Sequence, residues 1–91
     1  MNYQLIYPHS YLKRAKKFIS KHPEILGQYT KVLTLLEINP FHPSLRLHSL
    51  KGKHQSLSSV SINMSYRIVL NFIIRDKKII LIDIGTHDNV Y

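Results

Sequence analysis

Three segments of the sequence place histidine, lysine, arginine or tyrosine where these side chains could act on a phosphodiester. In the first, His48-Ser49-Leu50-Lys51-Gly52-Lys53, a histidine at the end of an expected strand leads into a glycine turn. Lys51 and Lys53 flank the glycine, so the turn could bind a phosphate group. The same residues also suit an ordinary surface turn with solvated lysines, because glycine is common in turns. Both interpretations are open on this segment alone.

The second segment is Tyr66-Arg67, which opens the most apolar stretch of the chain. The guanidinium of Arg67 offers a planar fork of donors to a phosphate or to a developing oxyanion. The alternative is a structural ion pair with Asp83 or another carboxylate. Only five Asp and Glu stand against thirteen Lys and Arg, so many basic groups must lack a carboxylate partner.

The third segment is the terminal Gly85-Thr86-His87-Asp88-Asn89-Val90-Tyr91, in which a strand is expected to end at glycine before His87. A histidine titrates near neutral pH and can transfer a proton in either direction. The alternative is a solvent-exposed histidine in a tail.

These residue types suit the cleavage of RNA by its own 2′-hydroxyl, because the substrate then supplies the nucleophile. The protein needs only a base, an acid and cations that stabilise the phosphorane. DNA lacks this hydroxyl. The sequence has no His-x-x-x-His or similar pair at metal-ligand spacing and no glycine-rich nucleotide motif, so neither a metal nor a cofactor is expected.

Composition limits the partners of the chain. The formal net charge is +8 over 91 residues, and six histidines add charge below neutral pH, so RNA, DNA and acidic proteins are all possible partners. Cysteine is absent, which excludes disulfides. No secretory signal is recognisable and the apolar runs are too short to span a membrane, which predicts a cytoplasmic protein without a membrane partner. We find no linker or repeat and expect a single domain over residues 1–91.

The spacing of apolar residues predicts the elements that position these segments. A strand over residues 3–7 stops at Pro8, and a basic helix follows with Ser10 as its N-cap. A second helix begins at Pro23 and ends before Asn39-Pro40. The expected buried positions of the two helices are Leu12, Ala15, Phe18, Ile19, Ile25, Leu26, Tyr29, Val32, Leu33 and Leu36.

From Leu45 the period becomes two, which predicts strands over residues 45–48 and 59–64 and two more apolar strands over 66–74 and 79–84. The predicted fold class is α+β with the order β-α-α-β-β-β-β. A hairpin of two helices should cover one face of a mainly antiparallel sheet. The other face should be polar and basic, with Arg46 and His48 on one strand and Ser59, Ser61 and Asn63 on the next.

Three motifs together resemble the RelE/ParE toxin superfamily, and within it the RelE/StbE and YafQ-like ribosome-dependent mRNA interferases. They are Leu47-His48-Ser49-Leu50-Lys51-Gly52, Tyr66-Arg67-Ile68-Val69 and the terminal Asp83 to Tyr91, and the resemblance covers nearly the whole chain. It implies the fold above, a partner antitoxin, and cleavage of mRNA in the ribosomal A site.

The resemblance also implies roles for individual residues. His87 matches the C-terminal histidine that acts as general acid or base in YafQ-like members, and His48 matches the histidine before the Leu-Lys-Gly turn. Arg67 matches the arginine of RelE-like members, and Tyr91 matches the terminal aromatic residue. The expected catalytic residues are therefore His87, His48, Arg67 and Tyr91, and the expected RNA-binding residues are Arg46, Lys51 and Lys53.

The chain departs from the YafQ-like pattern at Ser61 and Ser65, where those enzymes have a histidine and an aspartate. The lysines and Arg67 can compensate as in RelE-like members, which would make the site a hybrid of the two patterns. Two further hypotheses stay open. One is a ParE-like toxin that inhibits DNA gyrase and needs no histidine, and the other is a degenerate member that only binds RNA or an antitoxin.

Overall fold

The computed structural model describes residues 2–50, 56–73 and 75–86. Its elements follow the predicted order β-α-α-β-β-β-β, with two short 3-10 turns added. They are β1 (Gln4–Ile6), α1 (His9–Lys21), η1 (Pro23–Ile25), α2 (Leu26–Ile38), η2 (Pro43–Leu45), β2 (His48–Ser49), β3 (Ser58–Ser61), β4 (Tyr66–Ile73) and β5 (Lys78–Thr86).

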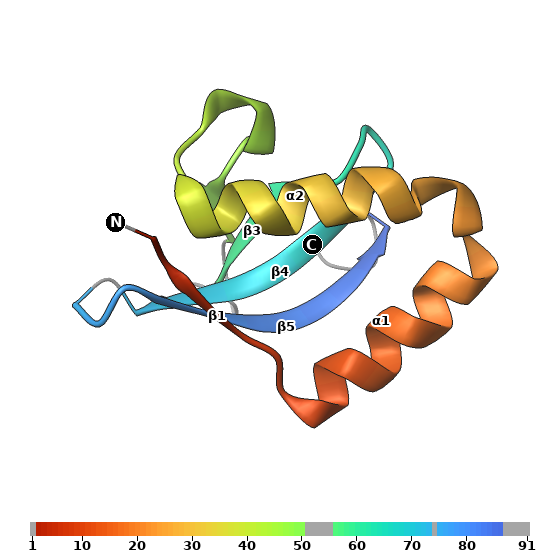
Figure 1. Ribbon diagram of the computed structural model, residues 1–91, viewed down its shortest axis with the longest axis horizontal. Helices are drawn as coiled ribbons and strands as arrows, with labels where there is room; N and C mark the ends of the chain where they lie inside the picture. Colours follow the sequence, from red (N-terminus) through yellow and green to blue (C-terminus); the bar gives the residue numbers. More distant parts are fainter. Residues whose placement is uncertain (1, 51–55, 74, 87–91) are drawn as a thin grey trace.

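The five strands form one sheet in the order β1-β5-β4-β3-β2. Only β1 and β5 pair in parallel, and the other neighbours are antiparallel, so the predicted α+β class with a mainly antiparallel sheet is confirmed. Both helices lie on the same side of the sheet, and α2 crosses β4 while α1 lies beside β5 (Figure 1). Among the described residues, no helix covers the opposite face of β2, β3 and β4.

The main core lies between the helices and one face of the sheet. It joins helical side chains to alternate residues of β3, β4 and β5, as the period-two pattern requires. Its fully or almost fully buried members are Tyr11, Ala15, Ile25, Val32, Leu36, Leu45, Val60, Ile62, Ile68, Leu70, Ile79, Leu81 and Ile84.

The N-cap of α1 and two of the expected buried positions were predicted wrongly. Pro8, not Ser10, is the N-cap of α1, and the carbonyl of Pro8 accepts the first helical hydrogen bond, from Leu12. Tyr11 is fully buried whereas Leu12 is 48% exposed, because the stripe that faces the sheet follows the i, i+4, i+7 spacing from Tyr11. Leu26 is likewise exposed, since α2 begins there after the 3-10 turn at Pro23.

The predicted strand over residues 45–48 is also wrong in its first half. Leu45 ends the 3-10 turn η2, and Arg46 has a left-handed backbone with φ of 50°. This turn reverses the chain, so the strand begins only at His48. Arg46 and His48 therefore do not share one side of a strand.

The face opposite the helices is less open than expected. Ser59 and Ser61 are 0% and 8% exposed, and a second small apolar cluster of Leu50 and Val69 forms outside the main core, with Leu57 and Ile82 packed against it. Asn63 lies beyond β3, in the turn that leads to β4.

Candidate active site

The register of β3 and β4 brings Ser61 and Arg67 directly opposite each other. A guanidinium N–H of Arg67 (Nη1) donates a hydrogen bond of 2.6 Å to the Ser61 hydroxyl oxygen. Arg67 also pairs with Gly85 on its other side, at the end of β5. The start of β4 therefore places the basic group between the ends of two neighbouring strands.

His48 lies on the same face of the sheet as Arg67. In β2 it stands opposite Ser59, and Ser59 and Ser61 point to one side because they are two residues apart on β3. Two strand spacings and a two-residue offset put the Cα atoms of His48 and Arg67 roughly 12 Å apart. The sheet thus presents a histidine and an arginine on one face, on either side of β3.

The ring of His48 has a defined tautomer. Its Nδ1 lies 2.9 Å from the carbonyl oxygen of Arg46. A carbonyl can only accept, so Nδ1 carries the proton and Nε2 holds the lone pair when the ring is neutral. The residue is exposed, and Nε2 is the ring nitrogen that does not contact Arg46.

Arg46 contributes through its backbone in a way that sequence reasoning missed. Its left-handed conformation turns the chain between η2 and β2, and its carbonyl accepts from His48. Arginine has no preference for this conformation, so no sequence signal marks it. The side chain of Arg46 is exposed, as an RNA-binding role requires.

The two serines that depart from the YafQ-like pattern lie in different surroundings. Ser61 is buried beside Arg67, whereas Ser65 is exposed in the turn between β3 and β4. There the side-chain oxygen of Asn63 accepts from the backbone N–H groups of Ser65 and Tyr66, at 2.8 and 2.9 Å. Ser61 is therefore part of the candidate site, and Ser65 belongs to the turn that shapes it.

Asp83, the carboxylate considered as a structural partner for Arg67, contacts α1. One of its oxygens lies 3.9 Å from the Arg14 guanidinium and accepts from the backbone N–H of Ile84 at 2.8 Å. Arg14 also donates to the Ile82 carbonyl, at 3.3 Å. These contacts attach α1 to β5.

Tyr66, next to Arg67, is held from the helical side. Its ring packs edge-on against Phe18 and beside His22, with centroid distances of 5.1 and 4.8 Å. Its hydroxyl lies 3.2 Å from Nδ1 of His22. This cluster anchors the first residue of β4 to the end of α1.

Four of the predicted site residues, Lys51, Lys53, His87 and Tyr91, lie outside the described residues. Their assigned roles stay predictions. Within the described ranges, no group of three or more His, Asp or Glu side chains could hold a metal ion. No helix in this part of the chain is long and apolar enough to cross a membrane.

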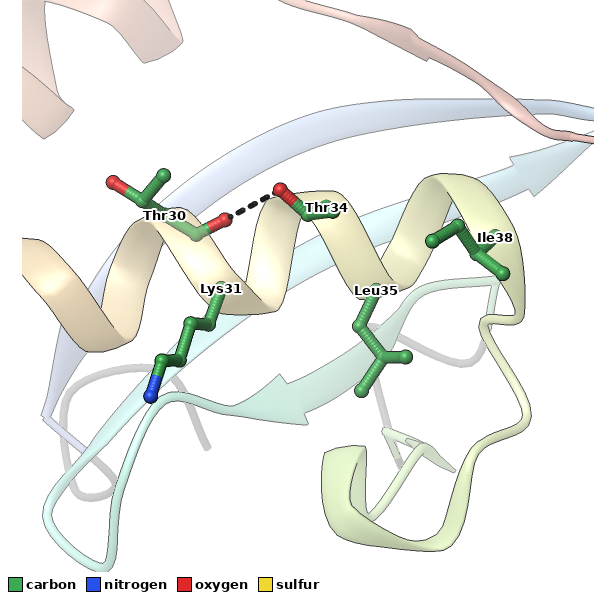
Figure 2. A pocket seen from close by; sticks show the side chains of 5 residues that line it. All are labelled: Thr30, Lys31, Thr34, Leu35 and Ile38. Carbon is green, nitrogen blue, oxygen red and sulfur yellow. Dashed lines mark hydrogen bonds between the residues drawn. The ribbon is translucent and has the colours of Figure 1, made fainter.

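A shallow groove on α2 is separate from these residues. Its volume is about 300 Å³ and it is lined by Thr30, Lys31, Thr34, Leu35 and Ile38. Figure 2 shows these side chains along a single helix, with the Thr34 hydroxyl donating to the Thr30 carbonyl at 3.1 Å. The lining holds no acid-base pair, so we do not assign chemistry to this groove.

Comparisons with known proteins relate the fold to bacterial toxins. YafQ from E. coli strain BL21(DE3) superposes with a TM-score of 0.79 over 98% of both chains, at 16% identity. The E. coli DinJ-YafQ toxin-antitoxin complex gives a TM-score of 0.77 over 100% of this chain and 99% of that chain, at 18% identity. The RelBE2 toxin-antitoxin complex from Mycobacterium tuberculosis gives 0.63 over 96% and 100%, at 9% identity.

No protein-family model and no curated protein matches the sequence. The relation therefore rests on three-dimensional similarity over nearly the full length of each chain. The two helices and the five-stranded sheet of this chain lie within the superposed regions, which cover 98–100% of the chain. The chain thus has the fold of the RelE/YafQ-like toxins.

Proposed function

We propose that this protein, as one domain over residues 1–91, is the cytoplasmic toxin of a type II toxin-antitoxin system. In this proposal it is a metal-independent endoribonuclease that cuts mRNA in the ribosomal A site. The observation that carries the proposal is the shared sheet face of His48 and Arg67, in a chain with the RelE/YafQ-like toxin fold. The resemblance in sequence supplies the remaining assignments.

The proposed reaction begins with proton transfer from the 2′-hydroxyl to Nε2 of His48. The 2′-oxygen then attacks the adjacent phosphorus, and a 2′,3′-cyclic phosphate forms as the bond to the 5′-oxygen breaks. Arg67 stabilises the negative charge that builds up on the phosphorane oxygens. His87 protonates the leaving 5′-oxygen, which is the acid role that general acid-base catalysis requires.

The other predicted site residues bind the substrate in this proposal. Arg46, Lys51 and Lys53 contact backbone phosphates, whose charge complements the net +8 of the chain. Tyr91 offers an aromatic ring on which a base can stack. The partner of the free toxin is an antitoxin, because the structural relatives include the DinJ-YafQ and RelBE2 toxin-antitoxin complexes. An acidic or amphipathic segment that folds on docking would complement the basic surface.

The proposal is tested by expression in bacterial cells, with growth curves and primer-extension mapping of mRNA ends. We expect wild-type protein to arrest growth with cuts in phase with codons. His48→Ala, Arg67→Ala and His87→Ala should each abolish or strongly reduce the cuts. His9→Ala and Arg75→Ala change exposed residues of the same types outside the site and serve as matched controls.

The other outcomes identify the competing functions. Growth arrest without mRNA cuts, unaffected by the three substitutions, would favour a gyrase inhibitor of the ParE kind. Unaffected growth would favour a degenerate binder. Co-purification of each variant with the antitoxin shows that it is folded.

A further inference from the structure

We propose that Ser61 is a positioning residue that holds the guanidinium of Arg67 toward the centre of the candidate active site. This inference rests on the proposed ribonuclease function. It is carried by the 2.6 Å hydrogen bond from Arg67 to the Ser61 hydroxyl and by the burial of Ser61, which is 8% exposed. Ser61 thereby acquires a role that does not require it to transfer a proton.

The direction of the contact matters because β3 lies between β4 and β2. Arg67 belongs to β4 and His48 to β2, so a hydrogen bond to β3 directs the guanidinium toward the strand that carries the histidine. The guanidinium is thereby oriented toward the side of the sheet on which His48 lies. Without this contact, the guanidinium would lose the partner that directs it toward β3.

The backbone around Ser61 is well supported. Ser61 is the last residue of β3, and immediately after it the backbone N–H of Ile62 donates to the Tyr66 carbonyl at 2.9 Å. The Asn63 side chain closes the turn, and the ring of Tyr66 is anchored by Phe18 and His22. Both partners of the hydrogen bond therefore start from positions held by independent contacts.

A hydroxyl is chemically suited to this task. Fixing an arginine side chain costs conformational entropy, and a hydrogen bond formed in the free protein means that this cost is met before the substrate binds. A carboxylate at this position would also orient the guanidinium, but it would neutralise the charge that a phosphate needs. Serine orients Arg67 and leaves its charge intact.

The test compares Ser61→Ala, Ser61→Thr and Ser61→Asp in purified toxin on ribosomes programmed with mRNA. We expect Ser61→Ala to lower the single-turnover cleavage rate about tenfold, with little change in the ribosome concentration for half-maximal rate. Ser61→Thr keeps the hydroxyl and should recover most of the rate. Ser61→Asp keeps an acceptor but cancels charge, so its loss should exceed that of Ser61→Ala. Ser58→Ala, on the same strand but in register with Leu70, is the matched control.

A role through Arg67 predicts non-additivity. In the Arg67→Ala background, Ser61→Ala should lower the rate no further, because the group that it positions is gone. A wild-type rate for Ser61→Ala, or an equal loss in both backgrounds, overturns the inference.

A second measurement separates this inference from the proposed function. The ¹H-¹⁵N signals of the Arg67 guanidinium report its contact with Ser61 and need no RNA. We expect these signals to shift and broaden in Ser61→Ala and to return in Ser61→Thr. If wild-type toxin does not cleave RNA, the ribonuclease proposal fails. If the Arg67 signals are the same in Ser61→Ala as in wild type, the positioning role fails, whether or not the toxin cleaves RNA.

Discussion

The hydroxyl groups of Tyr11 and Tyr29 lie 2.8 Å apart and form a hydrogen bond between α1 and α2. The two helices diverge from the turn at residues 22–25 (Figure 1), and this bond joins the beginning of α1 to the first turn of α2. Tyr11 is fully buried and Tyr29 half-buried. The pair thus supplies a polar link within the main core.

Replacing Tyr11 separates the contribution of this bond from that of the ring. Tyr11→Phe keeps the ring and should lower the free energy of unfolding by about 1 kcal/mol, the usual net value of a hydrogen bond. Tyr11→Ala should lower it by about 3–5 kcal/mol, because it also opens a cavity. Urea denaturation measures both losses of stability, with Tyr7→Phe as a control at a tyrosine that is only partly buried, 38% exposed. A Tyr11→Phe variant as stable as wild type would show that the bond contributes nothing.

The same tyrosines predict loss of stability in alkali. Burial, the first cause, and the hydrogen bond with Tyr29 raise the pKa of Tyr11 above its ordinary value of 10.0, and burial also raises the pKa of Tyr7 and Tyr29. Above about pH 10 the unfolded chain therefore binds fewer protons than the folded one. The free energy of unfolding should be independent of these groups below that pH and fall as the pH rises beyond it.

Thermal denaturation between about pH 8 and pH 11 tests whether stability falls as the pH rises. The slope of the free energy of unfolding against pH is set by the difference in protons bound by the unfolded and folded states. Tyr11→Phe should reduce this slope, since it removes one of the tyrosines whose pKa is raised. A slope as steep in Tyr11→Phe as in wild type would assign the alkaline loss to other groups, such as the lysines.

Because Arg46 has a left-handed backbone, its effect on stability can be tested separately from its effect on RNA binding. Arg46→Gly should be at least as stable as wild type, because glycine adopts this conformation without strain. Arg46→Val should lose about 1–2 kcal/mol, since a β-branched residue is strained there. Both variants remove the side-chain charge.

RNA binding should respond to charge alone at this position. If the Arg46 side chain contacts a phosphate, Arg46→Gly should weaken binding and reduce the slope of log K against log salt by about 1. Arg46→Lys should restore the slope. An unchanged slope in Arg46→Gly would exclude the phosphate contact.

Polyanions should stabilise the free protein. α1 carries Lys13, Arg14, Lys16, Lys17 and Lys21 and no acidic residue, and each of these basic residues is exposed. Polyphosphate should therefore bind the folded state and raise the Tm by a few degrees, with the effect fading as salt is added. Neutral dextran is the control, and a Tm that polyphosphate leaves unchanged at low salt would contradict an accessible basic surface.

The sequence by itself determined the order of the elements and the class of the fold. Helical and strand periods differ, and prolines bound the helices locally, so the change from helical spacing before residue 39 to strand patterns from residue 59 onward could be seen without coordinates. Arg67 at the start of an apolar strand was recognisable for the same reason. The roles of Lys51, Lys53, His87 and Tyr91 come from sequence alone and stay predictions.

Tertiary structure alone decided which of these residues meet. Of the neighbouring residues Tyr11 and Leu12, the tyrosine is the buried one. Its hydroxyl can be buried because Tyr29, on the other helix, forms a hydrogen bond with it. The chain reversal at Arg46 could not be predicted from the alternation of apolar residues, because the turn imposes the backbone conformation of Arg46. From the sequence, Ser61 is only a position where an acid-base residue of the YafQ-like pattern is missing. The strand register places it opposite Arg67, from which it accepts a hydrogen bond. Register depends on contacts between segments distant in sequence, which local periodicity does not encode.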